Sequence, residues 1–420
     1  MNVPEAGPLA RDVRFHLRRP ITACRMHHGG IGVIQQSEGS CDNVLWGRIT
    51  RKIRVTACMR LSIVLPTFNE RENIRPIAMQ LLTLEEVYDL ELIFVDDDSQ
   101  DGTANEVRDI AHNYPCVRLI RRVGRSGLSS AIKEGILDAT GDVVVVMDCD
   151  GQHEPSAVAR TVDTLQQSGH DLVIGSRFHP EANIHGLSAK RERNSKFAND
   201  VARYSLPRYR QLTDYMSGFF ALRVDRCLAY VRDVDVSGFK FLYEMLAISK
   251  GHLRVSEVPL TFMPRTAGES KLNIAVIWDL GVSILHTLLF RAIPRRAVSF
   301  ALVGGTGIAI HLMVYAFTRR SFGWSFEQAQ IMAVVTAATS NYLINNVLTF
   351  RAQQLKGILI LVGLVRFLLV TSLGMIANVG VSSAFLRQVW HQPLLALMAG
   401  IAVDFVWKYA ASSRFVWNSN

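Results

Sequence analysis

The stretch VVVVMDCDGQHEP, residues 143–155, sets a run of valines directly before two aspartates. Four β-branched residues in succession are typical of a strand that is buried on both faces of a sheet. Asp148 and Asp150 follow this strand, and no lysine or arginine stands beside them to balance their charge. The stretch therefore predicts a sheet whose edge concentrates negative charge at the end of an inner strand.

Similar apolar runs recur on both sides of this strand and alternate with segments of helical spacing. We expect further strands in LSIVLP (61–66), LELIFVDDD (90–98), VRLIRR (117–122), HDLVIGSRF (170–178) and LRVSEVPLTF (253–262). Helices are expected at 69–84, with Asn69 as the N-terminal cap, at 103–114 and at 127–140. This alternation is typical of an α/β domain with a mostly parallel sheet, whose ligands bind beyond the carboxyl ends of the strands.

The residues after the valine run have a spacing that suits a metal ion. Asp148, Asp150 and Gln152 share one parity, so their side chains point the same way on an extended chain. Two neighbouring carboxylates repel each other unless a cation lies between them. Mg²⁺ and Mn²⁺ accept such oxygens and complete their shell with phosphate and water. The pattern predicts a site for a metal-bound diphosphate, with a solvated turn as the alternative.

Two other strand ends carry candidate nucleoside contacts. In FVDDDSQDGT, Asp97 can accept hydrogen bonds from a nucleotide. After the first strand, Phe68 can pack on a base or ribose between Pro66 and Glu70, or it is a core aromatic. The residues that follow Asp97 can also cap the next helix, namely Ser99, Asp101 and Thr103.

Basic residues follow the later strand ends, where an anion can be held. Arg177 ends one expected strand, and Arg265 precedes the apolar half of the chain. Arginine matches phosphate oxygens in a two-pronged geometry and stays charged at physiological pH. Contact with anionic lipid is the alternative for the residues nearest the apolar half. The other members of this set are Arg191, Arg193, Ser195, Lys196, Ser270 and Lys271.

After residue 273 the chain becomes apolar. Residues 274–296 predict an interfacial amphipathic helix and linker, with Asp279 and His286 recurring on one side. Arginine and lysine in the short loops put the α/β domain on the cytoplasmic side. A buried soluble bundle is the alternative to four membrane spans, which would run at about 297–318, 326–350, 358–386 and 393–412.

This apolar half repeats itself. SFALVGGTGIAIHLMVYAF (299–317) is similar to RFLLVTSLGMIANVGVSSAF (366–385), which predicts two related helical hairpins unless chance explains the likeness. Polar side chains are costly in lipid. We therefore expect the following ones to face the interior of the bundle: Asn341, Asn345, Arg366, Asn378, Asp404 and Lys408.

Composition narrows the partners. The net charge of +9 suits a nucleic acid, an anionic membrane or a phosphate-rich substrate as the partner. The sequence has no basic stripe with interleaved aromatic residues, which argues against nucleic acid. Six scattered cysteines form no C-x-x-C pair, so free thiols are expected. Residues 1–58 have no apolar periodicity, and we expect an unstructured or spurious leader before Met59.

Eight segments in order resemble dolichol-phosphate mannosyltransferases, which are family 2 glycosyltransferases with a GT-A fold. They are SIVLPTFNERENI, FVDDDSQDGT, GLSSAIKEG, MDCDGQHEP, VIGSRF, DYMSGFFALR, GFKFLYEML and VPLTFMPRTAGESKLN. VGGTG and NYLINNVLTF resemble a GtrA-like membrane module. The resemblance implies a Rossmann-like GT-A domain at 59–273, a linker at 274–296 and four transmembrane helices in two hairpins at 297–420. Tyr215 departs from the family, where proline is common at this position.

The resemblance implies a reaction and a role for each candidate residue. Mannose would pass with inversion from GDP-mannose to a polyprenyl (dolichyl or undecaprenyl) phosphate, at the cytoplasmic face of the inner membrane. A phosphate acceptor is already ionised, so no general base is expected, although Asp214 is available. Mg²⁺ or Mn²⁺ would be held by Asp148, Asp150 and Gln152. The nucleoside would contact Pro66, Phe68, Glu70 and Asp97. The acceptor phosphate or the donor diphosphate would be bound by Arg177, Arg191, Ser195 and Arg265, and Lys271 would order the loop of the GESK motif.

Two alternatives stay open. The first is a hexosyl transferase that uses a UDP-sugar. The second belongs to a different class, a carrier that binds or flips lipid-linked sugars while its cytosolic domain regulates it. A homo-oligomer is compatible with either.

Overall fold

The computed structural model describes residues 59–125, 127–184, 189–236, 238, 240–263, 274–388 and 393–417. The expected leader at 1–58 lies outside the described residues. The expected α/β region and the expected helical region both lie within them, apart from the gaps between these ranges.

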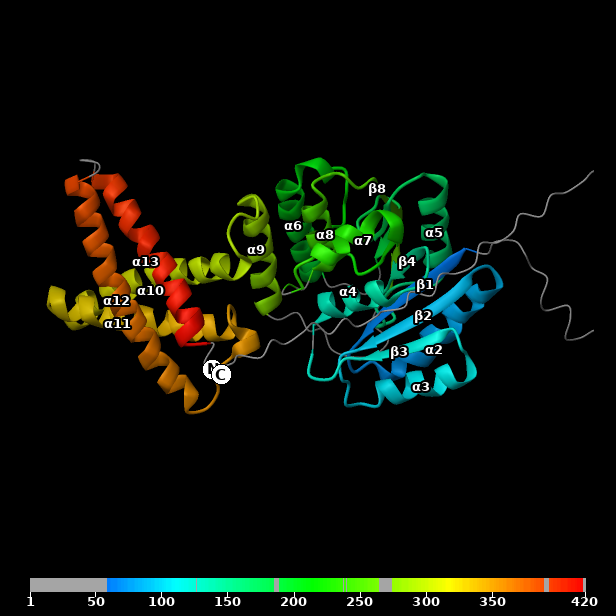
Figure 1. Cartoon of the computed structure of the whole chain (residues 1–420), viewed down its shortest axis with the longest axis horizontal. Coiled ribbons are helices and arrows are strands. Elements are labelled where there is room, and N and C mark those ends of the chain that lie inside the picture. The colour runs from blue at the N-terminus through cyan, green and yellow to red at the C-terminus, as the bar shows by residue number, and fades with distance from the viewer. Residues whose placement is uncertain are drawn as a thin grey trace, which may run out of the picture. The chain divides into compact units, whose positions relative to one another are not determined.

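A seven-stranded sheet forms the centre of the α/β domain, in the order β3-β2-β1-β4-β7-β5-β8 (Figure 1). Neighbouring strands are parallel except for β7, which is antiparallel to both β4 and β5. The six expected strands are confirmed, in a sheet that is mixed because of β7. The seven strands of the sheet are β1 Arg60–Thr67, β2 Asp89–Asp96, β3 Val117–Arg121, β4 Val143–Val146, β5 Leu172–Ser176, β7 Phe220–Arg223 and β8 Val255–Pro259.

Strand β7 was not predicted, because four residues between a loop and a helix give too short a pattern. It matters for the site. An antiparallel strand begins at the edge where its parallel neighbours end, so the segment before Phe220 lies beside the end of β4. A second, two-stranded sheet pairs β6 (Asn183–Ile184) with β9 (Thr261–Phe262) in parallel.

The alternation of strand residues builds a hydrophobic core on each face of the sheet. Val144 and Val146 pack into one core, and Val143 and Val145 pack into the other. All four are buried, as their unbroken apolar run predicts. The first core is covered by α4 (Leu128–Asp138), α7 (Val224–Asp233) and α8 (Phe241–Ser249), and the second by α2 (Arg71–Leu82), α3 (Thr103–Asn113) and α5 (Ala157–Gln167). Helix α6 (Ala189–Ser205) adds Ala202 to the first core, and short 3₁₀ turns occupy Thr83–Glu86 and Pro207–Tyr209.

Helix α2 begins later than expected, and Asn69 is not its cap. Glu70 holds the N-cap position, while Asn69 has a φ of 57° and its Oδ1 accepts the Gln100 N–H at 3.2 Å. Asparagine tolerates the left-handed backbone better than most residues. Its side chain therefore serves the neighbouring strand-end loop instead of the helix.

Five further helices follow the α/β domain. They are α9 (Ile274–Leu288), α10 (Arg295–Phe322), α11 (Phe326–Val347), α12 (Leu359–Gln388) and α13 (Pro393–Phe415), with a 3₁₀ turn at Arg351–Gln353. Helix α10 packs mainly on α11, and α12 packs mainly on α13. Within the described residues, two segments are long and apolar enough to cross a membrane, Arg295–Phe322 and Leu359–Asn378. That α11 and α13 also span the membrane remains a prediction.

The two helix pairs share one contact that supports the sequence repeat. A Cβ added to Gly307 of α10 would lie 2.7 Å from Asn341 Cγ of α11. The equivalent residue of α12, Gly374, faces Asp404 of α13 in the same way, with 2.5 Å to Oδ1. In both pairs a glycine lets a polar side chain approach the neighbouring backbone.

The expected inward orientation of the polar membrane residues holds only in part. Asn345 is buried, and Asp404 pairs with Lys408 at 2.7 Å with both side chains half-buried. Arg366 is exposed, so its expected inward orientation is wrong. It lies near the start of α12, where a long side chain can reach the helix ends, and its Nη1 donates to Phe415 O at 3.5 Å.

Helix α9 turns its polar residues towards protein rather than towards water. Asp279 pairs with Arg351, and His286 is also buried. The outer side of α9 carries exposed apolar residues instead, including Ile277 and Leu288. The side of the helix that carries Asp279 and His286 is thus a packing face.

Candidate functional site

The chain after β4 bends in a turn that carries Asp148 and Asp150, whereas an extended chain was expected there. The strand ends at Val146, and Gly151 adopts a φ of 75°, a conformation that favours glycine. The extended chain assumed for Asp148, Asp150 and Gln152 is therefore wrong. Asp150 Oδ1 accepts the Gln152 N–H at 3.1 Å, which closes the turn. Asp150 and Gln152 are buried, whereas the Asp148 side chain is 32% exposed.

Three carboxylates still gather at this turn. Burial and the negative charges of Glu70, Asp150 and Asp148 raise the pKa of the enclosed Cys149 thiol well above its ordinary value. Glu70 comes from the end of β1 and the other two from the end of β4, as the parallel order of these strands requires. Among the described cysteines, Cys116, Cys149 and Cys227 are free, in agreement with the expectation.

These oxygens suit a hard divalent cation. Within the described ranges, no three His, Cys, Asp or Glu side chains are arranged to hold a metal by themselves. Two carboxylates and an amide would leave several coordination positions for diphosphate and water, which is how Mg²⁺ is commonly bound. A Cβ at Gly218 would lie 2.6 Å from Asp148 Cγ, so the neighbouring MSGFF segment must keep glycine there for this carboxylate to fit.

His153 ties the acidic turn to the strand before residues 264–273. Its Nε2 lies 3.7 Å from Asp148 Oδ2, and its ring packs between Phe219 and Phe262. Its backbone also bridges to Phe262, and Gln152 O accepts the Met263 N–H at 2.9 Å. The sequence contained this residue in GQHEP, but nothing in the pattern gave it a role.

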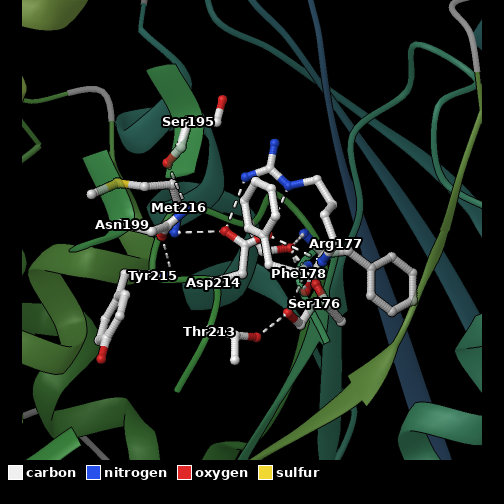
Figure 2. Close-up of polar contacts among 12 residues, drawn as sticks. Ser176, Arg177, Phe178, Ser195, Asn199, Thr213, Asp214, Tyr215 and Met216 are labelled. Carbon is white, nitrogen blue, oxygen red and sulfur yellow. Dashed lines mark hydrogen bonds and ion pairs between the residues drawn. The ribbon is translucent and has the colours of Figure 1, made fainter. Parts of the chain in front are cut away.

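Arg177 and Asp214 form a buried ion pair beside the acidic turn (Figure 2). Arg177 Nε and Nη2 donate to the two carboxylate oxygens at 2.7 and 2.9 Å, and Asp214 is fully buried. Burial by itself would raise the pKa of Asp214, but the Arg177 charge and hydrogen bonds outweigh it and lower the pKa. A carboxylate held in this way is a poor proton acceptor, which supports the expectation of no general base.

The loop that carries Asp214 is held from β8. Glu257 accepts hydrogen bonds from the N–H and Oγ1–H of Thr213 and from the Asp214 N–H, each at 2.9 Å. Asp214 therefore stays fixed at the same edge as Asp148, because β7 starts there and runs antiparallel to β4.

The lowered pKa of Asp214 gives a testable dependence of stability on pH. A carboxylate whose folded pKa lies below its unfolded value contributes stability at all pH values above the unfolded pKa, and loses it as pH falls through the folded pKa. We expect Asp214→Asn to lower the melting temperature of the full chain by a constant amount above about pH 5, and by less below about pH 4. Thermal unfolding in detergent across this range checks it, and a deficit that grows towards low pH would contradict it.

A second buried ion pair lies at the end of β2, where a nucleoside contact was predicted. Arg122, itself fully buried, contacts Asp97, Glu134 and Ser130, and Asp97 Oδ2 accepts the Gly127 N–H at 2.6 Å. Burial raises the pKa of Asp97, and the Gly127 hydrogen bond and Arg122 only partly offset it. Both oxygens of Asp97 thus hold the 122–127 loop.

The remaining nucleoside candidates divide between surface and interior. Phe68 is 43% exposed at the strand-end edge, which excludes the core alternative. Pro66 is buried within β1. Glu70 accepts from Asn73 Nδ2 at 2.7 Å and faces the acidic turn. Asp101 Oδ1 accepts the Thr103 N–H at 2.9 Å, but Gly102 holds the N-cap position of α3 and no side chain caps this helix, so the predicted capping is wrong.

One basic residue of the site was missed. Lys240, in GFKFLYE, lies immediately before α8. Burial and the Arg177 charge lower the pKa of Lys240, and the charges of Asp148 and Asp214 act against them. These influences place Lys240 among all three groups. A single lysine before a helix gave no signal in the sequence, because only the antiparallel β7 explains why this part of the chain returns to the edge.

The predicted anion-binding residues are described unequally. Ser195 lies on α6, with Arg193 and Lys196 exposed beside it. Arg191 lies in the same helix, but its side chain is outside the described residues. Arg265, Ser270 and Lys271 also lie outside them.

Comparison with known proteins extends this geometry. Residues 62–230 match the glycosyl transferase family 2 model, and residues 299–417 match the GtrA/DPMS transmembrane domain model. A dolichol-phosphate mannosyltransferase of Pyrococcus furiosus is 33% identical over 86% of this chain and 99% of its own. One of Saccharomyces cerevisiae is 36% identical over 51% of this chain and 82% of its own.

Among solved structures, a Mycobacterium tuberculosis glucosyl-3-phosphoglycerate synthase is 21% identical, with a TM-score of 0.42 over 55% of this chain and 80% of that chain. The region that matches the glycosyl transferase family 2 model covers all or most of every strand of the mixed sheet except β8. The region that matches the GtrA/DPMS model covers all or most of each of helices α10–α13. The chain belongs to the dolichol-phosphate mannosyltransferases of glycosyltransferase family 2, and it is a membrane protein with a GtrA/DPMS transmembrane domain.

Proposed function

We propose that this chain transfers mannose from GDP-mannose to a polyprenyl phosphate, with inversion at the anomeric carbon. One observation carries the proposal. The acidic turn of Asp148 and Asp150 and the basic pair of Arg177 and Lys240 meet at one edge of the sheet. An acidic turn suits a metal-bound diphosphate, and neighbouring basic groups suit the phosphate of the acceptor.

The division of labour follows from charge. Asp148, Asp150 and Gln152 would hold Mg²⁺ or Mn²⁺, which when bound supplies positive charge to the departing nucleoside diphosphate. Arg177, with Arg191, Ser195 and Arg265, would hold the acceptor phosphate in line with the sugar. The attacking phosphate oxygen is already ionised, so the enzyme's tasks are positioning and charge stabilisation. A single in-line displacement yields a β-linked product.

Contacts with the nucleoside fall to the opposite end of the edge. Phe68 is exposed and can stack on the base, with Pro66 and Glu70 beside it. Asp97 would contribute by shaping the 122–127 loop as well as by any contact of its own. Lys271 would order the loop of the GESK motif.

The acceptor would approach from the side of α6 and α9. Phe197 and Tyr204, seven residues apart on α6, are 70% and 72% exposed. Exposed aromatics beside Arg193 and Lys196 suit the headgroup region of a bilayer. We propose that α10–α13 all cross the inner membrane and that the α/β domain lies on its cytoplasmic side, as the loop charges indicate.

A donor screen tests the proposal. Purified full-length protein, a polyprenyl phosphate and Mn²⁺ are incubated with GDP-mannose or with UDP-glucose. We expect a lipid-linked mannose from GDP-mannose, little product from UDP-glucose, and a β linkage by NMR. Faster transfer from UDP-glucose would favour the hexosyl alternative. Absence of transfer from every donor, together with binding of lipid-linked sugar, would favour the carrier.

A further inference from the structure

Two side chains of α6 hold the loop that fixes Arg177: Arg203 Nη2 donates to Leu212 O at 3.3 Å, and Asn199 contacts the residue after Asp214. Asn199 Oδ1 accepts the Tyr215 N–H at 2.8 Å, next to Asp214 (Figure 2). Its Nδ2 donates to Ser195 O at 3.0 Å, one turn earlier in α6. Asn199 is 2% exposed, so neither bond is exchanged with bulk water. The amide therefore joins two places that the fold brings together from different elements.

Each of those places belongs to a different half of the proposed reaction. The Tyr215 side leads through Asp214 to Arg177, since the Met216 N–H and three groups of Arg177 share the Asp214 carboxylate. The Ser195 side leads to the first half of α6, where Arg191 and Ser195 are proposed to hold the acceptor phosphate. A change in the Asn199 contacts would alter the distance between Arg177 and the first half of α6.

We propose that Asn199 and the backbone N–H of Tyr215 form a positioning contact that sets the acceptor-binding end of α6 relative to Arg177. This rests on the proposed function, in which both hold phosphate. The bond needs a residue with an N–H at position 215, which proline lacks. Any residue other than proline at this position can therefore keep the contact.

The chain offers matched variants that separate the hydrogen bond from packing. Asn199→Leu removes both bonds at similar volume. Tyr215→Pro removes the N–H together with the buried ring, whereas Tyr215→Ala removes the ring and keeps the N–H. Asp200→Leu is the control on α6, because Asp200 is exposed one residue away.

We expect Asn199→Leu and Tyr215→Pro to raise KM for the polyprenyl phosphate about tenfold and to leave KM for the sugar donor within about twofold. Tyr215→Ala and Asp200→Leu should keep the acceptor KM within about threefold. The double variant Asn199→Leu/Tyr215→Pro should have an acceptor KM no higher than that of Asn199→Leu, since both changes remove the same hydrogen bond between Asn199 and the Tyr215 N–H. An unchanged acceptor KM, or an equal rise for both substrates, would overturn the proposal.

Hydrogen–deuterium exchange of the full chain in detergent tests the contact without an assay of sugar transfer. Amides of 189–198 should exchange faster in Asn199→Leu and Tyr215→Pro than in Asp200→Leu and Tyr215→Ala. Each variant is compared with its own control, Asn199→Leu with Asp200→Leu and Tyr215→Pro with Tyr215→Ala. If a protein in one comparison does not fold, the other comparison still tests the contact. Unchanged exchange would refute the contact, whereas absence of sugar transfer by the unmodified chain would refute only the proposed function.

Discussion

Asp150→Ala is expected to lower kcat/KM for sugar transfer by about a thousandfold or more at every practical concentration of Mg²⁺ or Mn²⁺. Asp150 is buried, closes the turn through the Gln152 N–H, and lies with Asp148 and Glu70 around one thiol. Its loss would remove both a proposed metal ligand and the bond that shapes the turn. Initial rates against metal concentration measure the effect.

Glu154→Ala is the matched control for this variant. Glu154 lies four residues further along the same segment and pairs with Arg160 at 2.8 Å, away from the three carboxylates. It should retain near-normal activity and an unchanged metal dependence. Normal turnover of Asp150→Ala, or of the unmodified protein in excess chelator, would refute the metal-bound diphosphate.

Arg177→Met is expected to abolish transfer and to destabilise the α/β domain by about 3–5 kcal/mol. The reason is that Asp214 is fully buried and would lose the guanidinium that balances its charge and donates to both of its oxygens. For a domain of this size, that corresponds to a fall in melting temperature of about 10 °C. Thermal unfolding of the full chain in detergent measures it.

The double variant Arg177→Met/Asp214→Asn separates the two roles of the pair. Removing both charges should recover much of the lost stability, because no unpaired ion remains in the interior. Transfer should stay absent, since the proposed phosphate contact is still missing. Recovery of activity together with stability would show that Arg177 serves only to balance Asp214.

The sequence predicted the sheet well, because buried parallel strands give unbroken apolar runs. The valines at 143–146 are buried as expected, and the polar residues after β1, β2, β4 and β5 do follow strand ends. The prediction that Asp148, Asp150 and Gln152 lie close together assumed an extended backbone, and this assumption is wrong. Gly151 turns the chain, so the acids meet through a bend and not through the parity of an extended strand.

The basic part of the site was harder to predict. Arg177 was found because it follows a recognisable strand, but its partner Asp214 lies before β7, whose four residues form no pattern. Lys240 and Asn199 were missed for the same reason. Their roles depend on which segments the antiparallel strand returns to the edge, and local spacing carries no such information.

The helical half shows a similar limit. The four helices follow from apolar content, and Gly307 and Gly374, which hold equivalent positions in the repeat, are both sites of close approach in the structure. The orientations of Arg366 and of the α9 polar residues were not predictable, since they depend on neighbouring helix ends and on Arg351.

The most direct test of the account is whether the acidic turn binds a metal ion that also touches the donor diphosphate. Electron paramagnetic resonance of Mn²⁺ with the full-length protein and GDP, with phosphorus hyperfine coupling as the readout, measures both. The account predicts bound Mn²⁺ coupled to phosphorus in the unmodified chain and in Glu154→Ala, and loss of both signals in Asp150→Ala. The same coupling in Asp150→Ala, or no bound Mn²⁺ in the unmodified chain, would contradict it.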